Sequence, residues 1–272
     1  KPMKYALFLI CALSALPPAK ALAASSEWMD ITGGKARLII AEPVPGAGNT
    51  DALLQVDLNP GWKTYWRDPG DAGVPLQLDF SASRNAKLVD VLYPVPKRFD
   101  NGVTIWAGYD RPVAFGLKLE RPDSASPVSL KGSVFIGVCE KICVPVQLVF
   151  EVEAPDSATT TIQREVVALG MVQLPLAPEP GMRVTNVSVA DKSLTIEVEA
   201  FDNGVPPELF LAGDHSMQFK APLLKSAGNG KAVFEAGILY WKPEIPGAPV
   251  PAHYTLVSGG ESASGVLQIP AN

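Results

Sequence analysis

Apolar residues alternate with polar ones, or run together in short stretches, along most of the chain. The earlier stretches are 36–41, 52–58, 113–119, 128–138 and 144–152. Later ones are 184–189, 194–198, 209–212, 232–236, 254–257 and 266–269. They are rich in Val, Ile, Leu and Phe, and clusters of Gly, Pro, Asn or Asp separate them, as is typical of short strands. The pattern predicts an all-β chain with the strand spacing of β-sandwiches.

The alternation is interrupted between residues 154 and 181. Asp156 and Ser157 can cap a helix, and Gly170 can end one. Between them, apolar residues recur at helical spacing: Ile162, Val166 and Leu169. The proline-rich stretch 174–181 then reads as a stiff linker.

These changes divide the chain into expected parts. We predict a first β-sandwich at residues 24–155, a short helix and linker at 156–181, and a second β-sandwich at 182–272. The sequence assigns the second sandwich no chemistry of its own.

The first 23 residues have the pattern of a secretory signal peptide. Lys1 and Lys4 precede an apolar run at 5–16, and Ala-Leu-Ala at 21–23 places small residues where a signal peptidase cleaves. We expect cleavage after Ala23, which would remove Cys11. No later apolar run reaches about 18 residues, so we expect a soluble, periplasmic mature protein.

Charge narrows the possible partners. The chain has 23 basic and 28 acidic residues, and loss of Lys1, Lys4 and Lys20 with the signal peptide would lower its formal net charge from −5 to −8. An acidic chain of this kind is a poor partner for nucleic acid or for an anionic membrane surface. No hydrolase motif or phosphate-binding loop is found, and no cofactor is expected.

The strongest chemical signal is the pair Cys139 and Cys143, with Glu140, Lys141 and Ile142 between them. Cys139 ends one strand pattern and Cys143 begins the next, so the pair is expected to flank a three-residue hairpin loop. Residues in such positions can come close enough for a disulfide. In a secreted protein that bond can persist.

Three interpretations of the pair remain open from the residues alone. A structural disulfide is common in secreted β-domains, but a ring of about five residues stabilises by only ~2 kcal/mol. A Cu(I) site would suit two thiolates, although His215 and His253 both lie in the second domain. The third interpretation is a reversible dithiol and disulfide.

The surrounding motifs resemble the N-terminal periplasmic region of the thiol:disulfide interchange protein DsbD family, and especially its ScsB-like branch. The motifs are GWKTYWRDPGDAGVP at 61–75, YPVPKRF at 93–99, TIWAGY at 104–109 and the cysteine hairpin at 139–145. The similarity covers residues 30–152 well and the second sandwich more loosely. It implies two immunoglobulin-like β-sandwich domains. The membrane-spanning and thioredoxin-like parts of the family are not in this sequence. We therefore expect the chain to resemble the domain as a standalone soluble protein.

The resemblance implies a relay of reducing equivalents. A protein-disulfide reductase-like activity of Cys139 and Cys143 would reduce thioredoxin-fold proteins, such as disulfide isomerases or cytochrome c maturation factors, with electrons from a separate membrane donor. The order of the cysteines in the family implies that Cys143 attacks and Cys139 resolves. Copper tolerance is a further role associated with the resemblance.

In the family a cap loop shields the sulfurs from oxidants. By resemblance, shielding residues are expected in and near the first motif: Trp62, Tyr65, Trp66, Asp68, Asp71 and Tyr109. The tryptophans, Trp106 included, are more often core residues than shielding ones, and 69–71 could be an ordinary turn.

Overall fold

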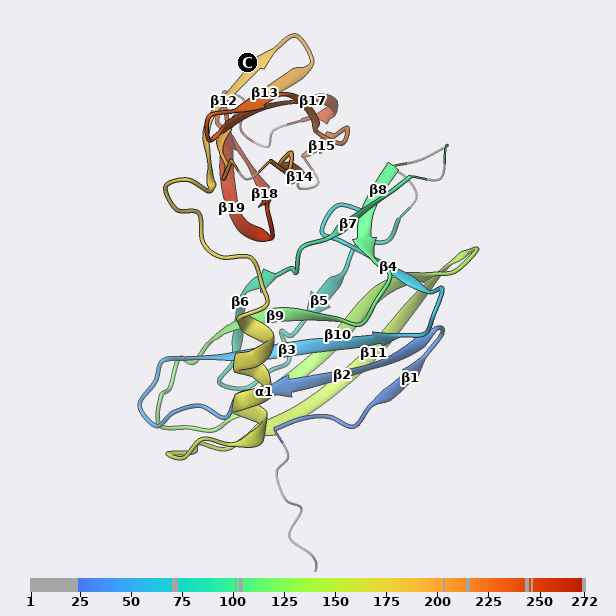
Figure 1. The fold of residues 1–272 in the computed structure, drawn as a ribbon. Coiled ribbons are helices and arrows are strands. Elements are labelled where there is room, and N and C mark those ends of the chain that lie inside the picture. Colours follow the sequence, from blue (N-terminus) through green and yellow to red (C-terminus); the bar gives the residue numbers. More distant parts are fainter. Residues whose placement is uncertain are drawn as a thin grey trace, which may run out of the picture.

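The computed structural model describes residues 24–69, 73–100, 102, 105–202, 204–213, 216–242, 245 and 247–270. Within these residues the chain forms two antiparallel, immunoglobulin-like β-sandwiches with one α-helix between them in sequence (Figure 1). The expected signal peptide and Cys11 lie outside the described residues. The limits 24–155, 156–181 and 182–272 for the separate parts stay a prediction.

The first sandwich consists of two sheets built from β1 to β11. One sheet has the strand order β1 (Met29–Ile31), β2 (Gly34–Ile40), β3 (Asn49–Leu58), β9 (Val113–Glu120) and β6 (Lys87–Leu92). The other has the order β11 (Cys143–Ala154), β10 (Val128–Cys139), β4 (Lys63–Tyr65), β8 (Ile105–Tyr109) and β7 (Lys97–Asp100), and β5 (Gln77–Asp79) also pairs with β10.

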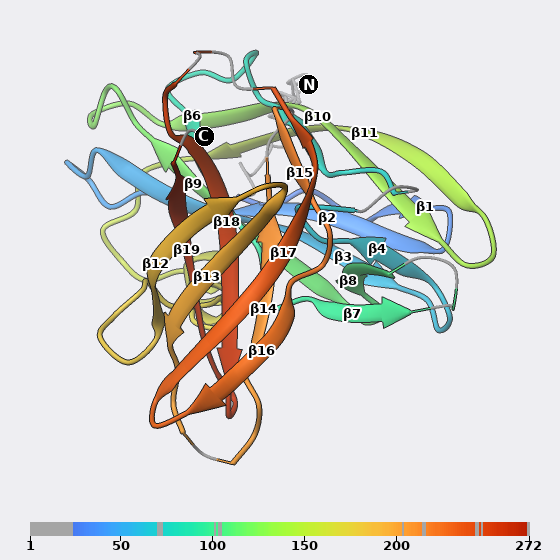
Figure 2. The same cartoon turned by 90° about the horizontal axis from the view of Figure 1, so that it is seen from above.

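The second sandwich consists of two sheets built from β12 to β19. The larger has the order β12 (Arg183–Ala190), β13 (Ser193–Glu199), β17 (Lys231–Trp241) and β15 (Met217–Phe219), with β16 (Leu223–Gly228) also paired to β17. The smaller has the order β14 (Glu208–Ala212), β18 (Val250–Ser258) and β19 (Glu261–Ile269). Figure 2 looks onto this sandwich, with strands of the first behind it.

Each sandwich has its own core, formed where the apolar faces of its two sheets meet. Leu54 and Phe115 of one sheet and Phe150 of the other are buried together in the first sandwich. Ile196 and Phe234 of the larger sheet and Leu256 of the smaller are buried together in the second. This burial explains the alternation in the sequence, because successive side chains of a strand point to opposite faces.

Each of the eleven predicted apolar stretches lies almost wholly within a strand, so the long strands are confirmed. The strands without a prediction are mostly short: β1, β4, β5, β6, β7, β8, β15 and β16. Several have only three or four residues, too few to show an alternating pattern. Tertiary pairing, rather than their own sequence, holds them in the sheets.

Helix α1 (Ile162–Met171) is present, but its start and its buried face differ from the prediction. Thr161, not Asp156 or Ser157, is the N-cap, and its hydroxyl accepts a hydrogen bond from the Arg164 backbone N–H. Asp156 pairs instead with Arg121, which leaves it unavailable as a cap.

The face of α1 that packs on β2 and β3 is centred on Val167, whereas Ile162 and Leu169 are exposed. Gly170 does not end the helix. A Cβ atom at Gly170 would lie 2.3 Å from Leu53 Cδ1, so glycine permits close contact between α1 and β3.

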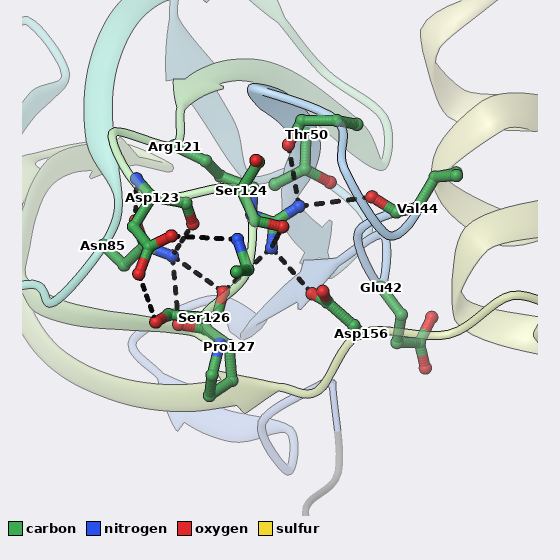
Figure 3. Close-up of polar contacts among 12 residues, drawn as sticks. Glu42, Val44, Thr50, Asn85, Arg121, Asp123, Ser124, Ser126, Pro127 and Asp156 are labelled. Carbon is green, nitrogen blue, oxygen red and sulfur yellow. Dashed lines mark hydrogen bonds and ion pairs between the residues drawn. The ribbon is translucent and has the colours of Figure 1, made fainter.

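Arg121, just after β9, joins the loops at the end of the first sandwich near α1 (Figure 3). Its side chain is fully buried. It donates hydrogen bonds to four backbone carbonyls, those of Val44, Ala47, Ser124 and Ser126. Its Nη2 also lies 2.7 Å from Asp156 Oδ1. Three of these carbonyls also accept from a second donor: Val44 from the Ala47 N–H, Ser124 from the Gly46 N–H and Ser126 from Asn85 Nδ2. Arg121 therefore links loops that are already partly hydrogen-bonded, and it fixes the chain that leads to α1.

Candidate functional site

The cysteine pair lies at the tip of the hairpin between β10 and β11. Cys139 and Cys143 are the last opposed residues of the two strands, with Cα atoms 4.3 Å apart, and their sulfurs are joined in a disulfide. The predicted three-residue loop is confirmed. Because the hairpin itself brings the two residues together, the bond can open and close without a large backbone movement.

The two sulfur-bearing residues differ in exposure. Cys139 is only 8% exposed, whereas Cys143 is exposed. Ile142, directly before Cys143, is 74% exposed. An incoming molecule therefore reaches Cys143 more readily than Cys139.

The Tyr65 hydroxyl contacts both sulfurs. Its oxygen lies 2.9 Å from Cys139 Sγ and 2.7 Å from Cys143 Sγ. Tyr65 ends β4, which pairs with β10 so that Lys63 is opposite Cys139. The Thr64 hydroxyl donates a 2.8 Å hydrogen bond to the Gly137 carbonyl and ties β4 to the hairpin.

Close packing holds the Tyr65 ring in place. A Cβ atom at Gly137 would lie 3.3 Å from the ring and 2.6 Å from Val74 Cβ, so the strand beneath the tyrosine needs glycine. On another side the ring meets Trp106 edge-on, with centroids 5.2 Å apart. Tyr65 is 6% exposed, and burial raises the pKa of its hydroxyl above the ordinary value. The hydroxyl therefore keeps its proton at neutral pH.

This arrangement gives Tyr65 a defined chemical capacity. The sulfurs of a disulfide carry no proton, so the tyrosine is the donor in both contacts. After reduction, the same O–H can donate to a cysteine thiolate, and a hydrogen bond to the charged form lowers the pKa of a thiol. The site can therefore favour the thiolate that attacks in thiol–disulfide exchange.

An aromatic pair beside Tyr65 was not singled out from the sequence. Phe99 on β7 and Trp106 on β8 are directly opposed and stack, with centroids 4.2 Å apart. Lys63 and Lys97 place their ammonium groups 5.6 Å and 5.7 Å from the Phe99 ring centroid. Trp106 was considered only as a core residue, and both aromatics occur in short strands without a clear alternation.

Three of the expected shielding residues lie elsewhere. Trp62 packs so closely on Gly33 that a Cβ atom there would be 2.0 Å from the indole ring. Trp66 is buried against Phe210 of the second sandwich, and Tyr109 is buried edge-on against Phe115. The Tyr109 hydroxyl donates to the Pro94 carbonyl, and burial raises its pKa well above the ordinary value. Their contacts are those of core aromatics, so Tyr65 alone of the four is seen against the sulfurs.

The two aspartates give a mixed result. Asp68 lines a small cavity between the sandwiches, together with Arg98 and Phe210. Asp71 lies outside the described residues.

Among the described residues, no group of three or more His, Cys, Asp or Glu side chains is arranged to hold a metal ion. In the same part of the chain, no helix is long and apolar enough to cross a membrane.

Comparisons with known proteins match the first sandwich to a domain family and the fold of the chain to a solved structure. The family model for the N-terminal region of the thiol:disulfide interchange protein DsbD matches residues 36–154. The crystal structure of the N-terminal periplasmic domain of ScsB from Proteus mirabilis is similar with a TM-score of 0.69 and 20% sequence identity, over 92% of this chain and 100% of that chain. At this identity the likeness shows the fold.

A conserved domain protein from Bacillus anthracis overlaps 90% of each chain at 10% identity, with a TM-score of only 0.24. A search of curated protein sequences finds no significant match.

The cysteine hairpin, its tyrosine and both sheets of the first sandwich fall within or directly beside residues 36–154, which the family model matches. Residues 36–154 of this chain therefore match the family model of DsbD N-terminal domains, in a chain with the fold of the ScsB periplasmic domain.

Proposed function

We propose that this protein is a periplasmic thiol–disulfide exchange protein that passes reducing equivalents from Cys139 and Cys143 to thioredoxin-fold partners. The observation that carries the proposal is the Tyr65 hydroxyl, which lies within 3 Å of both sulfurs of an accessible hairpin disulfide. The family match at residues 36–154 supports the reaction class, and the partners follow by analogy with that family.

The proposed reaction has two steps. The exposed Cys143 thiolate attacks a disulfide of the client, which forms a mixed disulfide and releases one client thiolate that takes up a proton. The Cys139 thiolate then attacks the Cys143 sulfur, which closes the Cys139–Cys143 bond and releases the second client thiol. Two electrons and two protons pass to the client, and a membrane electron donor then restores the dithiol.

The roles of the two cysteines follow from their exposure. Cys143 is accessible to a partner, whereas Cys139 is sheltered and stays one hairpin loop away, ready to resolve. The Tyr65 hydroxyl can stabilise whichever sulfur carries the negative charge, because it reaches both.

A purely structural disulfide fits the site less well. A ring of about five residues contributes only ~2 kcal/mol in the chain-entropy model. Cys139 and Cys143 are, moreover, already held opposite each other by the eleven other paired positions of β10 and β11. The bond therefore adds little to the stability of the hairpin.

Electron transfer to a thioredoxin-fold client tests this proposal. Reduced protein is mixed in equal amounts with an oxidised periplasmic disulfide isomerase, and the free thiols of each are followed by alkylation and gel shift. We expect one client disulfide to be reduced for each Cys139–Cys143 bond formed. A variant with both cysteines replaced by serine serves as the control. A client that stays oxidised as it does with this control would contradict the proposal.

A further inference from the structure

Phe210 belongs to the second sandwich but contributes to the core of the first. It lies on β14 and is only 3% exposed. Its ring meets Trp66 edge-on, with centroids 5.9 Å apart. The Arg98 guanidinium lies 4.9 Å from the same ring, and Arg98 Nη2 donates a 3.0 Å hydrogen bond to the Leu209 carbonyl.

The contact between Phe210 and Trp66 lies next to Tyr65, on the side of the chain away from the sulfurs. Trp66 follows Tyr65 in sequence and continues the extended chain, since its backbone N–H donates to the Ala107 carbonyl at 3.0 Å. Successive side chains of an extended chain point to opposite sides. Tyr65 therefore faces the sulfurs, while Trp66, 2% exposed, faces Phe210.

Strand β4 has little backbone support of its own. It is three residues long, and only two residue pairs join it to β10 and two to β8. So short a strand depends on side-chain packing for its position. A hydroxyl that reaches two sulfurs at 2.7–2.9 Å demands an accurate position.

We propose that the second sandwich braces β4, and that Phe210 is a positioning residue that holds the Tyr65 hydroxyl on the cysteine sulfurs. The inference rests on the proposed function, to which it adds a role for the second sandwich. Arg98 supports the brace, because it contacts the Phe210 ring and the neighbouring Leu209 carbonyl together.

The test is the reactivity of Cys143 in the reduced protein, measured with iodoacetamide across a range of pH. In Phe210→Leu the smaller side chain leaves space beside Trp66, and β4 can shift into it. We expect the Cys143 pKa to rise and alkylation at pH 7 to slow by roughly three- to tenfold, as partial loss of a charge-assisted hydrogen bond predicts.

Phe234→Leu is the matched control. Phe234 lies on β17 in the core of the second sandwich and is 2% exposed, so the same change costs comparable packing energy away from Trp66. Its Cys143 reactivity is expected to equal that of the unchanged protein. If Phe210→Leu does not fold, Arg98→Met loosens the same contact and is expected to shift Cys143 in the same direction.

A double-mutant cycle with Tyr65→Phe shows whether Phe210 acts through the tyrosine. Tyr65→Phe should itself slow alkylation, and adding Phe210→Leu should then have little further effect. Additive effects, no effect of Tyr65→Phe, or equal rates in Phe210→Leu and Phe234→Leu would overturn the brace. Because iodoacetamide needs no protein partner, failure to reduce thioredoxin-fold clients would overturn the proposed function alone.

Discussion

Replacing Cys143 by serine is expected to abolish electron transfer to a thioredoxin-fold client, whereas replacing Cys139 is expected to trap the client. Cys143 is exposed and can attack a partner, so its loss removes the first step. Cys139 is 8% exposed and can only resolve, so its loss stops the reaction at the mixed disulfide. The two variants should therefore differ sharply, although each lacks one sulfur.

Non-reducing gels and mass spectrometry of the covalent product measure this difference. With Cys139→Ser, we expect most of the client to become linked through Cys143, and a reductant should release it. With Cys143→Ser, we expect no linked product above the level of the double-serine control. Trapping by Cys143→Ser but not by Cys139→Ser would mean that the roles are reversed.

The second large effect is expected on stability, at Arg121. Arg121→Met keeps an apolar stem but leaves Asp156 without this partner and removes one donor from each of four loop carbonyls, three of which keep another donor. Breaking a buried ion pair from one side typically costs about 3–5 kcal/mol. Because the Asp156 side chain is 24% exposed, we expect the free energy of unfolding of the first sandwich to fall by about 3 kcal/mol, the lower end of that range.

Arg84→Met is the matched control, because Arg84 pairs with Glu153 at the surface and its side chain is 76% exposed. Exposed pairs contribute at most about 1 kcal/mol. Urea unfolding followed by tryptophan fluorescence suits the comparison, since four of the five tryptophans lie in the first sandwich. Equal midpoints for the two variants would show that Arg121 does not hold the loops as described.

The sequence predicted the architecture wherever burial imposes a period of two over many residues. Strands such as β3, β10 and β13 are buried on one or both faces, and their apolar residues show it. The helix start was wrong because a capping side chain also serves as an ion-pair partner. Asp156 has the chemistry of an N-cap, but the buried Arg121, 35 residues away, engages it.

The candidate site could be predicted only in part for a related reason. The hairpin is local, so the spacing of Cys139 and Cys143 was sufficient to place the two sulfurs together. Tyr65, in contrast, lies 74 residues before Cys139 in sequence. Trp62, Tyr65 and Trp66 occur in one aromatic stretch, and the sequence does not distinguish which of them contacts the sulfurs. Trp62 and Trp66 flank β4 and Tyr65 ends it, so their different contacts are decided by the side of this extended chain that each occupies and by what packs there.

The reduction potential of the Cys139–Cys143 pair tests the central claim most directly. The protein is equilibrated in glutathione or dithiothreitol redox buffers, and the fraction of dithiol is measured by alkylation. We predict a potential between about −270 and −180 mV, the range that spans thioredoxin and protein disulfide isomerase, so that the pair can cycle with such partners. A potential below about −300 mV, where structural disulfides typically lie, would contradict the account.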